Sequence, residues 1–353
     1  MAGLGSPLLL LIFLAGSAAT WLAGNLLSKT TDALDSRWGL GDDLGGLVLL
    51  SIAGSLPELA ITISAAASGN LPLAAGNLIG GIAIQTMVLL LCDYAVGPER
   101  PLTYLVGRLT PVLEGLLVIM LVALVDMGAL LKPSTAIGGV VSPASLAIVV
   151  IWFVGLFLIN KASRDPRWKV TMPGSSPGRR RRERARPEQP HPFAGSSTTR
   201  IALLFGLASL VTLVAGVALE ESGNELATKH NINGVIFGAT VLATASALPE
   251  ISSGIAAVRL GDHALAMGDI FGGNAFQVCL FLVADLVAGK PVLPSAGGNL
   301  NAWLGALGVA LTAIYGFGVI GRPMHTHARL GPDSLLALAL FGLGIAGLFV
   351  IPP

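Results

Sequence analysis

Long apolar segments separated by short polar ones fill almost the whole chain. Ten runs of predominantly apolar residues recur along it, each of about the 20 residues that an α-helix needs to cross the hydrocarbon core of a bilayer. We expect the ten helices at residues 7–27, 43–67, 71–93, 106–128, 138–160, 200–219, 232–259, 264–288, 298–320 and 332–351. The pattern therefore predicts an all-α polytopic membrane protein.

The composition agrees with this class. Of the 353 residues 53% are hydrophobic and only 12% are charged, with a mean hydropathy of +0.78. A soluble chain would carry about 25% charged residues. The 45 glycines favour close packing of membrane helices, because small residues let backbones approach. Cys92 and Cys279 fall inside predicted helices, where we expect packing residues and neither a disulfide nor a metal pair.

Basic residues gather between the fifth and the sixth apolar run. Eleven of the 21 Lys and Arg residues lie from Lys161 to Arg200. Because Lys and Arg accumulate in cytoplasmic loops, we expect residues 161–199 to be a cytoplasmic linker and both termini to lie outside. The run at 179–186 is expected to anchor this topology or to contact anionic lipid head groups, and nucleic-acid binding is not expected. The predicted location is the cell (plasma or inner) membrane.

The halves on either side of the linker repeat each other. Residues 54–97 align without a gap to residues 246–289, at a constant offset of 192. GSLPELAITISAAASGN faces SALPEISSGIAAVRLGD, and LPLAAGNLIGGIAIQ faces HALAMGDIFGGNAFQ. Five spans separate the copies, an odd number, so we expect the second copy to be inverted in the membrane, as in secondary transporters. The predicted units are a first five-helix repeat at 1–160 (repeated segment at about 43–97), the linker at 161–199, and a second five-helix repeat at 200–353 (repeated segment at about 232–289).

Each copy places a proline and a glutamate side by side within an apolar run. Pro57 and Pro249 break the helix and free backbone oxygens beside Glu58 and Glu250. Freed oxygens are tolerated at membrane depth only where something satisfies them, and an intramembrane carboxylate is functional by default. Two carboxylates from opposite copies, together with such oxygens, suit a hard divalent cation such as Ca²⁺.

Further oxygen-bearing residues are expected around this cation site. Neutral oxygens within one or two turns of the glutamates come from Ser51, Ser55, Thr244 and Ser246. The partner helices add the amides and the carboxylate of Asn77, Gln85, Asp269, Asn274 and Gln277. The paired glycines of these helices are expected either to break the helix locally or to permit close approach: Gly80, Gly81, Gly272 and Gly273.

The two copies resemble the α-repeats of the calcium/cation antiporter superfamily, which contains the sodium/calcium exchangers. The family pattern is roughly G-[ST]-S-[LM]-P-E on one helix and G-N-x-x-G-S-N-x-x-[ND] on the next. This chain has GSLPE and SALPE, then GNLIGGIAIQ and GDIFGGNAFQ. The resemblance implies that Glu58 and Glu250 are the central calcium-binding carboxylates and that Gly54 and Ser246 supply backbone oxygens. It also implies alternating access, with the first and sixth spans sliding over the rest.

The chain departs from the family pattern where coupling ions would bind. The family's serine is Gly81 or Gly273, its Asn or Asp one turn later is Gln85 or Gln277, and a hydroxyl beside the second glutamate is replaced by Ala247. The coupling ion therefore stays open between Na⁺ and H⁺. We expect a secondary active antiporter that exchanges Ca²⁺, or a similar divalent cation, for Na⁺ or H⁺, without a cofactor.

Other functions fit the sequence less well. A monovalent cation/proton antiporter would use the same two glutamates. An intramembrane enzyme is disfavoured, because all five histidines fall in predicted loops and no H-E-x-x-H motif occurs. A channel is disfavoured because a closed cage with two negative charges binds too tightly for fast permeation. The acidic stretch at Ala218–Asn231 is expected to be an outside loop, and the oligomeric state stays unpredicted.

Overall fold

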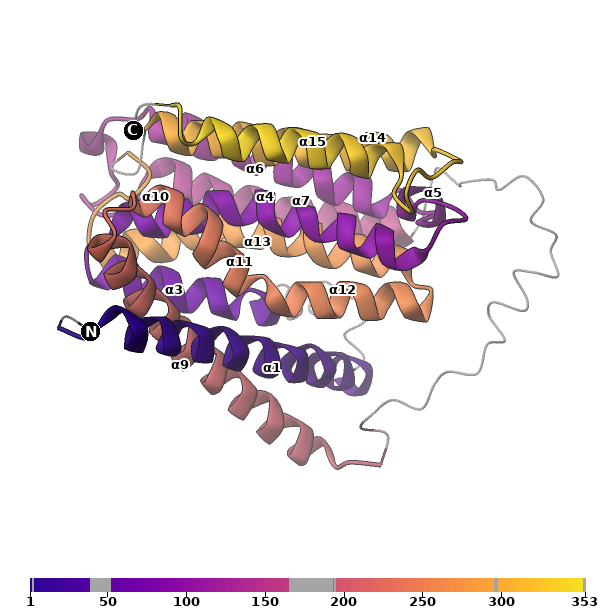
Figure 1. Cartoon of the computed structure of the whole chain (residues 1–353), viewed down its shortest axis with the longest axis horizontal. Coiled ribbons are helices and arrows are strands. Elements are labelled where there is room, and N and C mark those ends of the chain that lie inside the picture. Colours follow the sequence, from indigo (N-terminus) through magenta and orange to yellow (C-terminus); the bar gives the residue numbers. More distant parts are fainter. Residues whose placement is uncertain (2, 39–51, 165–192, 194, 295–297, 352–353) are drawn as a thin grey trace.

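The fold is a bundle of helices that run mostly along the long axis of the molecule, with both termini at one end (Figure 1). The computed structural model describes the chain except for residues 2, 39–51, 165–192, 194, 295–297 and 352–353 and the side chains of 32, 35 and 36. Ser51, most of the basic linker and its run at 179–186 thus lie outside the described residues.

The described helices follow the predicted apolar runs in order. They are α1 (Ser6–Trp38), α3 (Leu56–Ala67), α4 (Leu71–Val96), α5 (Leu102–Leu105), α6 (Thr110–Ala129), the 3₁₀ turn η1 (Pro133–Thr135), α7 (Pro143–Arg164), α9 (Thr198–Lys229), α10 (Gly234–Phe237), the π-helical turn η2 (Gly238–Leu242), α11 (Ala243–Ser246), α12 (Leu248–Leu260), α13 (His263–Ala288), α14 (Asn299–Gly321) and α15 (Pro332–Gly347). Side-chain caps start several of them, as where Asp262 accepts from the backbone N–H of Leu265 at 3.0 Å before α13.

Seven of the described helices are long and apolar enough to cross a membrane by themselves: α1, α4, α6, α7, α9, α13 and α14. An eighth span forms if Gly234–Ser246 and Leu248–Leu260, which meet at a bend of 46°, are taken together. Helices α3 and α15 are apolar but shorter. The chain is therefore an all-α, multi-pass membrane protein.

Both proline motifs start a new helix inside an apolar run. Pro57 lies in the first turn of α3, after a turn at Ser55 that follows the helical residues 52–54. Pro249 lies in the first turn of α12, directly after the bend that ends α11. Proline is accommodated there because the first N–H groups of a helix have no intrahelical partner anyway. Both apolar runs are thus interrupted at a proline.

The four glycines predicted to break the partner helices do not break them. Helix α4 is continuous through Gly80 and Gly81, and α13 is continuous through Gly272 and Gly273, so of the two expected roles helix breaking is excluded. The glycines of α4 serve close approach. A Cβ atom on Gly80 would lie 2.3 Å from the Cβ atom of Ala239 in η2, so only glycine lets the two backbones meet there.

The two longest helices, α1 and α9, pack along each other beside the rest of the bundle (Figure 1). Each touches one proline break through a glycine. A Cβ atom on Gly24 of α1 would lie 2.5 Å from Cγ of Pro249, and one on Gly216 of α9 would lie 3.0 Å from the carbonyl oxygen of Pro57. Gly24 and Gly216 stand at the same offset of 192 as the repeated segments. Each half thus lays its first helix against the break of the other half.

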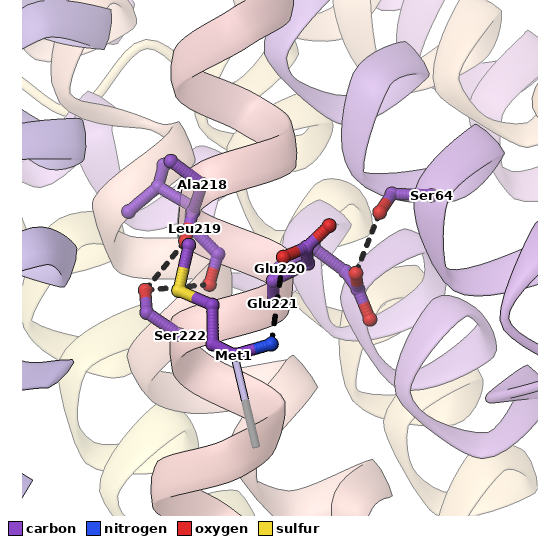
Figure 2. Close-up of polar contacts among 7 residues, drawn as sticks. All are labelled: Met1, Ser64, Ala218, Leu219, Glu220, Glu221 and Ser222. Atoms are coloured by element: carbon purple, nitrogen blue, oxygen red, sulfur yellow. Dashed lines mark hydrogen bonds and ion pairs between the residues drawn. The ribbon is translucent and has the colours of Figure 1, made fainter. Parts of the chain in front are cut away.

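Helix α9 extends through the stretch that was predicted to be an acidic loop. Residues 218–229 are helical, and Glu220 is only 1% exposed, so the loop prediction was wrong. Figure 2 shows the two neighbouring glutamates pointing to different partners: Glu220 accepts from the hydroxyl of Ser64 on α3 at 2.6 Å, and Glu221 faces the amino group of Met1 at 3.9 Å. A buried stripe at Leu219 and Ala227 keeps this segment helical against its neighbours.

Two matching aspartates fasten the ends of α4 and α13. Asp93 and Asp285 are 1% and 0% exposed, and each accepts two backbone N–H groups. Asp93 accepts from Leu102 at 2.6 Å and from Gly331, just before α15, at 2.7 Å. Asp285 accepts from Val292 at 2.6 Å and from Ser142, just before α7, at 2.8 Å. Each aspartate therefore holds the start of the last helix of the opposite half.

Candidate cation site

The two intramembrane glutamates lie together in the interior of the bundle. Glu58, in the first turn of α3, is fully buried, and Glu250, in the first turn of α12, is 9% exposed. The charge of Glu58 acts on Glu250, and the hydroxyl of Ser246 lies beside the Glu58 carboxyl group. The chain folds this way because each proline starts a helix at the same depth and so presents the next residue to the centre.

Each of these carboxyl groups has an oxygen without a hydrogen-bond partner. Oε2 of Glu58 and Oε2 of Glu250 are both buried and unpartnered, whereas Oε1 of Glu58 accepts from Nε2 of Gln85 at 3.1 Å. Buried polar atoms are paired in nearly all proteins, because an unpaired one loses its hydration without compensation. Two buried, unpaired carboxylate oxygens in the interior of the bundle are therefore suited to a cation.

The two glutamines that occupy matching positions have different partners. Gln85 of α4 donates to Glu58 of its own half. Gln277 of α13 instead donates across the halves to backbone oxygens of α4, at 2.8 Å to Leu78 and 3.3 Å to Asn77. Oε1 of Gln277 is buried without a partner. Gln85 thus joins α4 to α3, and Gln277 joins α13 to α4.

The matching pair Asn77 and Asp269 also differs between the halves. Asn77 is fully buried, and neither Oδ1 nor Nδ2 of its amide has a partner. Asp269 is half-buried, and its Oδ2 accepts from the hydroxyl of Ser253 at 2.9 Å. The charge of Asp269 acts on Glu250. The second half therefore has a negative charge near Glu250 where the first half has an amide.

The remaining predicted oxygens are divided between the site and its surroundings. Ser55 is buried next to the first break and Gly54 is half-buried there, while Ser246 donates to the carbonyl oxygen of Ala243 at 3.2 Å. Asn274 is fully buried and donates to the hydroxyl of Thr86 at 3.1 Å. Thr244 is exposed and donates to the carbonyl oxygen of Thr240 at 2.7 Å, so it was wrongly counted among the oxygens near the site.

One acidic residue near the site was missed in the sequence. Glu114 of α6 has a buried Oε2 atom without a partner, and the charge of Asp269 acts on it. The available signal was its place within the apolar run 106–128, because a carboxylate at membrane depth is functional by default. It went unnoticed because it has no counterpart in the repeated segments.

The acids do not gather into a chelating group. In the part of the chain that the structure describes, no three side chains of His, Cys, Asp or Glu are arranged to hold a metal ion. Cys92 and Cys279 are buried free thiols, in agreement with a packing role. The ligand set at the centre is therefore two carboxylates surrounded by amide and hydroxyl groups, a set of oxygen ligands typical of hard cations.

Comparison with known proteins gives consistent relatives. The model of the sodium/calcium exchanger protein family matches residues 8–166 and 200–351. The chain is similar to the inner membrane protein YrbG of Escherichia coli (strain K12), 26% identical over 71% of this chain and 69% of that protein. It is also similar to the putative antiporter CaxA of Alkalimonas amylolytica, 24% identical over 73% of this chain and 74% of that protein.

Two solved structures share the fold. The H⁺/Ca²⁺ exchanger CAX matches with a TM-score of 0.69 and 16% identity, over 98% of this chain and 82% of that chain. The sodium-calcium exchanger NCX_Mj matches with a TM-score of 0.59 and 15% identity, over 97% of this chain and 99% of that chain. Both likenesses extend over nearly the whole of the present bundle.

Proposed function

Because the chain belongs to the sodium/calcium exchanger family, whose members are transporters and not enzymes, we propose that it is a secondary active antiporter of the cell (plasma or inner) membrane. It carries Ca²⁺, or a similar divalent cation, in exchange for Na⁺ or H⁺. The single observation that carries this proposal is the pair of buried glutamates at matching positions of the two halves, each with an unpaired oxygen.

Glu58 and Glu250 are the two charged ligands of the transported cation in this proposal. Their electrostatic contact and their unpaired oxygens support it. The amides of Gln85 and Asn77, with the hydroxyl of Ser246, supply neutral oxygens nearby. An unoccupied pair of negative charges resists transfer through an apolar barrier, so the protein changes its access only with a cation or protons on the site, which makes the exchange obligatory.

The proposed architecture is ten spans arranged as two inverted repeats of five. Contacts between the halves support it, because matching residues make matching contacts. Gly24 and Gly216 each pack on the proline break of the opposite half, and Asp93 and Asp285 each hold the last helix of the opposite half. Helices α1 and α9 lie across both breaks and are the elements whose movement changes access from one face to the other.

The coupling ion is the part of the function on which the relatives differ. One structural relative is called an H⁺/Ca²⁺ exchanger and the other a sodium-calcium exchanger. The loss of the family's serine at Gly81 and Gly273 removes hydroxyl oxygens that would hold sodium. The alternative in which the same glutamates exchange a monovalent cation for protons is kept as a second outcome of the test.

The test is ⁴⁵Ca²⁺ uptake into proteoliposomes under an imposed sodium gradient and, separately, an imposed proton gradient. Glu58→Gln and Glu250→Gln should each lower uptake by about 100-fold or more, since removing one charge of a buried set costs several kcal/mol. Glu221→Gln is the control, because this glutamate is 46% exposed and faces the terminal amino group of Met1 at 3.9 Å. Unchanged ⁴⁵Ca²⁺ uptake in both glutamine variants would rule out the proposed site.

A further inference from the structure

A line of acidic groups continues from Glu250 toward one end of the bundle. Glu250 is more than nine-tenths buried, its Oε2 atom is unpartnered, and the charge of Asp269 acts on it. Ser253, one turn after Glu250, donates to Asp269 at 2.9 Å and lies 3.3 Å from the carbonyl oxygen of Glu250. The next acid is Glu114, on which the charge of Asp269 also acts.

Glu114 reaches this line from a third helix. Its Oε2 atom would lie only 3.1 Å from a Cβ atom on Gly268, the residue before Asp269. The glycine therefore gives the Glu114 carboxyl group its place against α13. The same oxygen is buried and has no hydrogen-bond partner, so nothing in the described part of the fold explains why a charged group is kept there.

The protein covers this side of the site less completely than the matching side. Four residues of the second half are half-buried, whereas their counterparts at the repeat offset in the first half are buried: Ser253 against Ile61, Gly268 against Gly76, Asp269 against Asn77, and Gly272 against Gly80. In the first half, α10 and η2 cover α4, with Val235 and Ala239 against Gly76 and Gly80. The residues around the glutamates are therefore covered less on the side of α13 than on the side of α4.

We propose that Asp269 and Glu114 are the access path along which the divalent cation moves between the glutamate pair and the end of the bundle where α12 ends and α13 begins. This inference rests on the proposed function. Asp269 and Glu114 are single carboxylates on different helices, so each is expected to hold a cation weakly and to release it. A line of single carboxylates raises the local cation concentration without trapping the ion, as a charged cleft does for any oppositely charged ligand.

The charge pattern indicates which membrane face this path opens to. Helix α12 ends beside Arg259, and α6, which carries Glu114, begins just after Arg108. Both arginines belong to loops that we expect in the cytoplasm. The path is thus expected to serve the cytoplasmic face, which inverted membrane vesicles expose.

The experiment measures ⁴⁵Ca²⁺ uptake as a function of Ca²⁺ concentration in inverted and in right-side-out vesicles that contain the full chain. Asp269→Asn and Glu114→Gln should each raise the half-saturating concentration in inverted vesicles by roughly 3- to 30-fold, within the range of electrostatic steering into a cleft. The shift of the half-saturating concentration should be several-fold smaller in right-side-out vesicles than in inverted ones, because the path opens to one face only. The double variant should show the largest shift.

Two further variants keep the result interpretable. Asp269→Glu retains the charge and should restore most of the affinity. Asp126→Asn is the matched control, because Asp126 lies at the other end of α6, half-buried against Gly305. Asn already occupies the position that matches Asp269 in the first half, so Asp269→Asn is expected to fold, and a single gel-filtration peak checks this.

The other outcomes overturn the access path. Equal shifts in both kinds of vesicle would make Asp269 and Glu114 part of the central site, and no shift in either would leave them without a role in cation movement. If the wild-type protein carried no ⁴⁵Ca²⁺ at all, the proposed function would fail by itself. The path would then be tested in the same vesicles with ²²Na⁺, where a shift confined to inverted vesicles still supports it.

Discussion

The two halves of the molecule match at the proline breaks and at the aspartates of the helix ends, and they differ in the residues around the two glutamates. Pro57 and Pro249 each start a helix after a break, and Asp93 and Asp285 each accept backbone N–H groups at a helix end. Around the glutamates the correspondence stops. Asn77 is sealed beneath η2, while Asp269, its counterpart, is half-buried beside a hydroxyl and a third helix.

This difference indicates which features a duplicated fold must keep. The two proline breaks have to lie at one depth, and both halves need the same hydrogen bonds at their helix ends to hold the breaks there. The residues around the glutamates do not follow this symmetry, because α10 and η2 cover α4 at Gly76 and Gly80, whereas the matching Gly268 and Gly272 of α13 are half-buried. In the proposed antiporter, this asymmetry suits a site that opens to one face at a time.

The largest expected effect comes from adding one methyl group to matching glycines. Gly76→Ala should destabilise the protein by about 3 kcal/mol, because the new Cβ atom would lie 2.6 Å from the backbone oxygen of Val235, which has no room to move. Gly268→Ala should cost less than about 1 kcal/mol, because its neighbour is the flexible end of Glu114 at 3.1 Å. Thermal unfolding in detergent measures both, and equal losses would contradict the difference in packing.

A smaller loss of stability, equal in the two halves, is expected when Asp93 or Asp285 at the helix ends is replaced. Asp93→Asn and Asp285→Asn each replace an acceptor of two backbone N–H groups by an amide that turns its NH₂ group toward one of them. Each should lower the free energy of unfolding by about 1–3 kcal/mol, the cost of leaving a buried donor unpaired. The two losses should agree within about 1 kcal/mol. A loss of stability in only one of the two variants would contradict the matching roles of Asp93 and Asp285.

The smallest effect separates the two matching glutamines. Gln85→Ala removes the donor to Glu58, so it should raise the half-saturating Ca²⁺ concentration by about tenfold, the equivalent of one hydrogen bond to a charged group. Gln277→Ala removes bonds to the backbone of α4 and should instead lower stability by about 1 kcal/mol, with the Ca²⁺ response within about twofold. Equal shifts in the Ca²⁺ response would show that both glutamines serve the cation directly.

The sequence predicts the order of the helices and the two breaks, because these depend on local properties. Apolar length sets each helix in a bilayer, and a proline has to stand in a first turn wherever a span contains one. The prediction that Glu58 pairs with Glu250 came from the repeat, since matching positions of two inverted copies are expected to meet near the same depth.

Features that depend on packing across helices could not be predicted in this way. The local sequence at Gly80 and Gly81 is compatible both with an unwound helix and with close packing of a neighbouring element. The close approach of η2 to α4 shows that the glycines serve packing. Glu220 was assigned to a loop because average hydropathy falls there, although the spacing of Leu219 and Ala227 marks one buried face. The role of Glu114 depends on Gly268, which lies far away in the sequence and next to it in space.

The lengths of α1 and α9 have a consequence for the lipid. Their 33 and 32 residues correspond to roughly 50 Å of helix, whereas the hydrocarbon layer is about 30 Å thick. The pair has to slant through the membrane or emerge from it, and a thinner bilayer increases the slant. Gly24 packs on Pro249 and Gly216 packs on Pro57. A change in membrane thickness that tilts α1 and α9 is therefore expected to shift the two proline breaks at the centre of the protein.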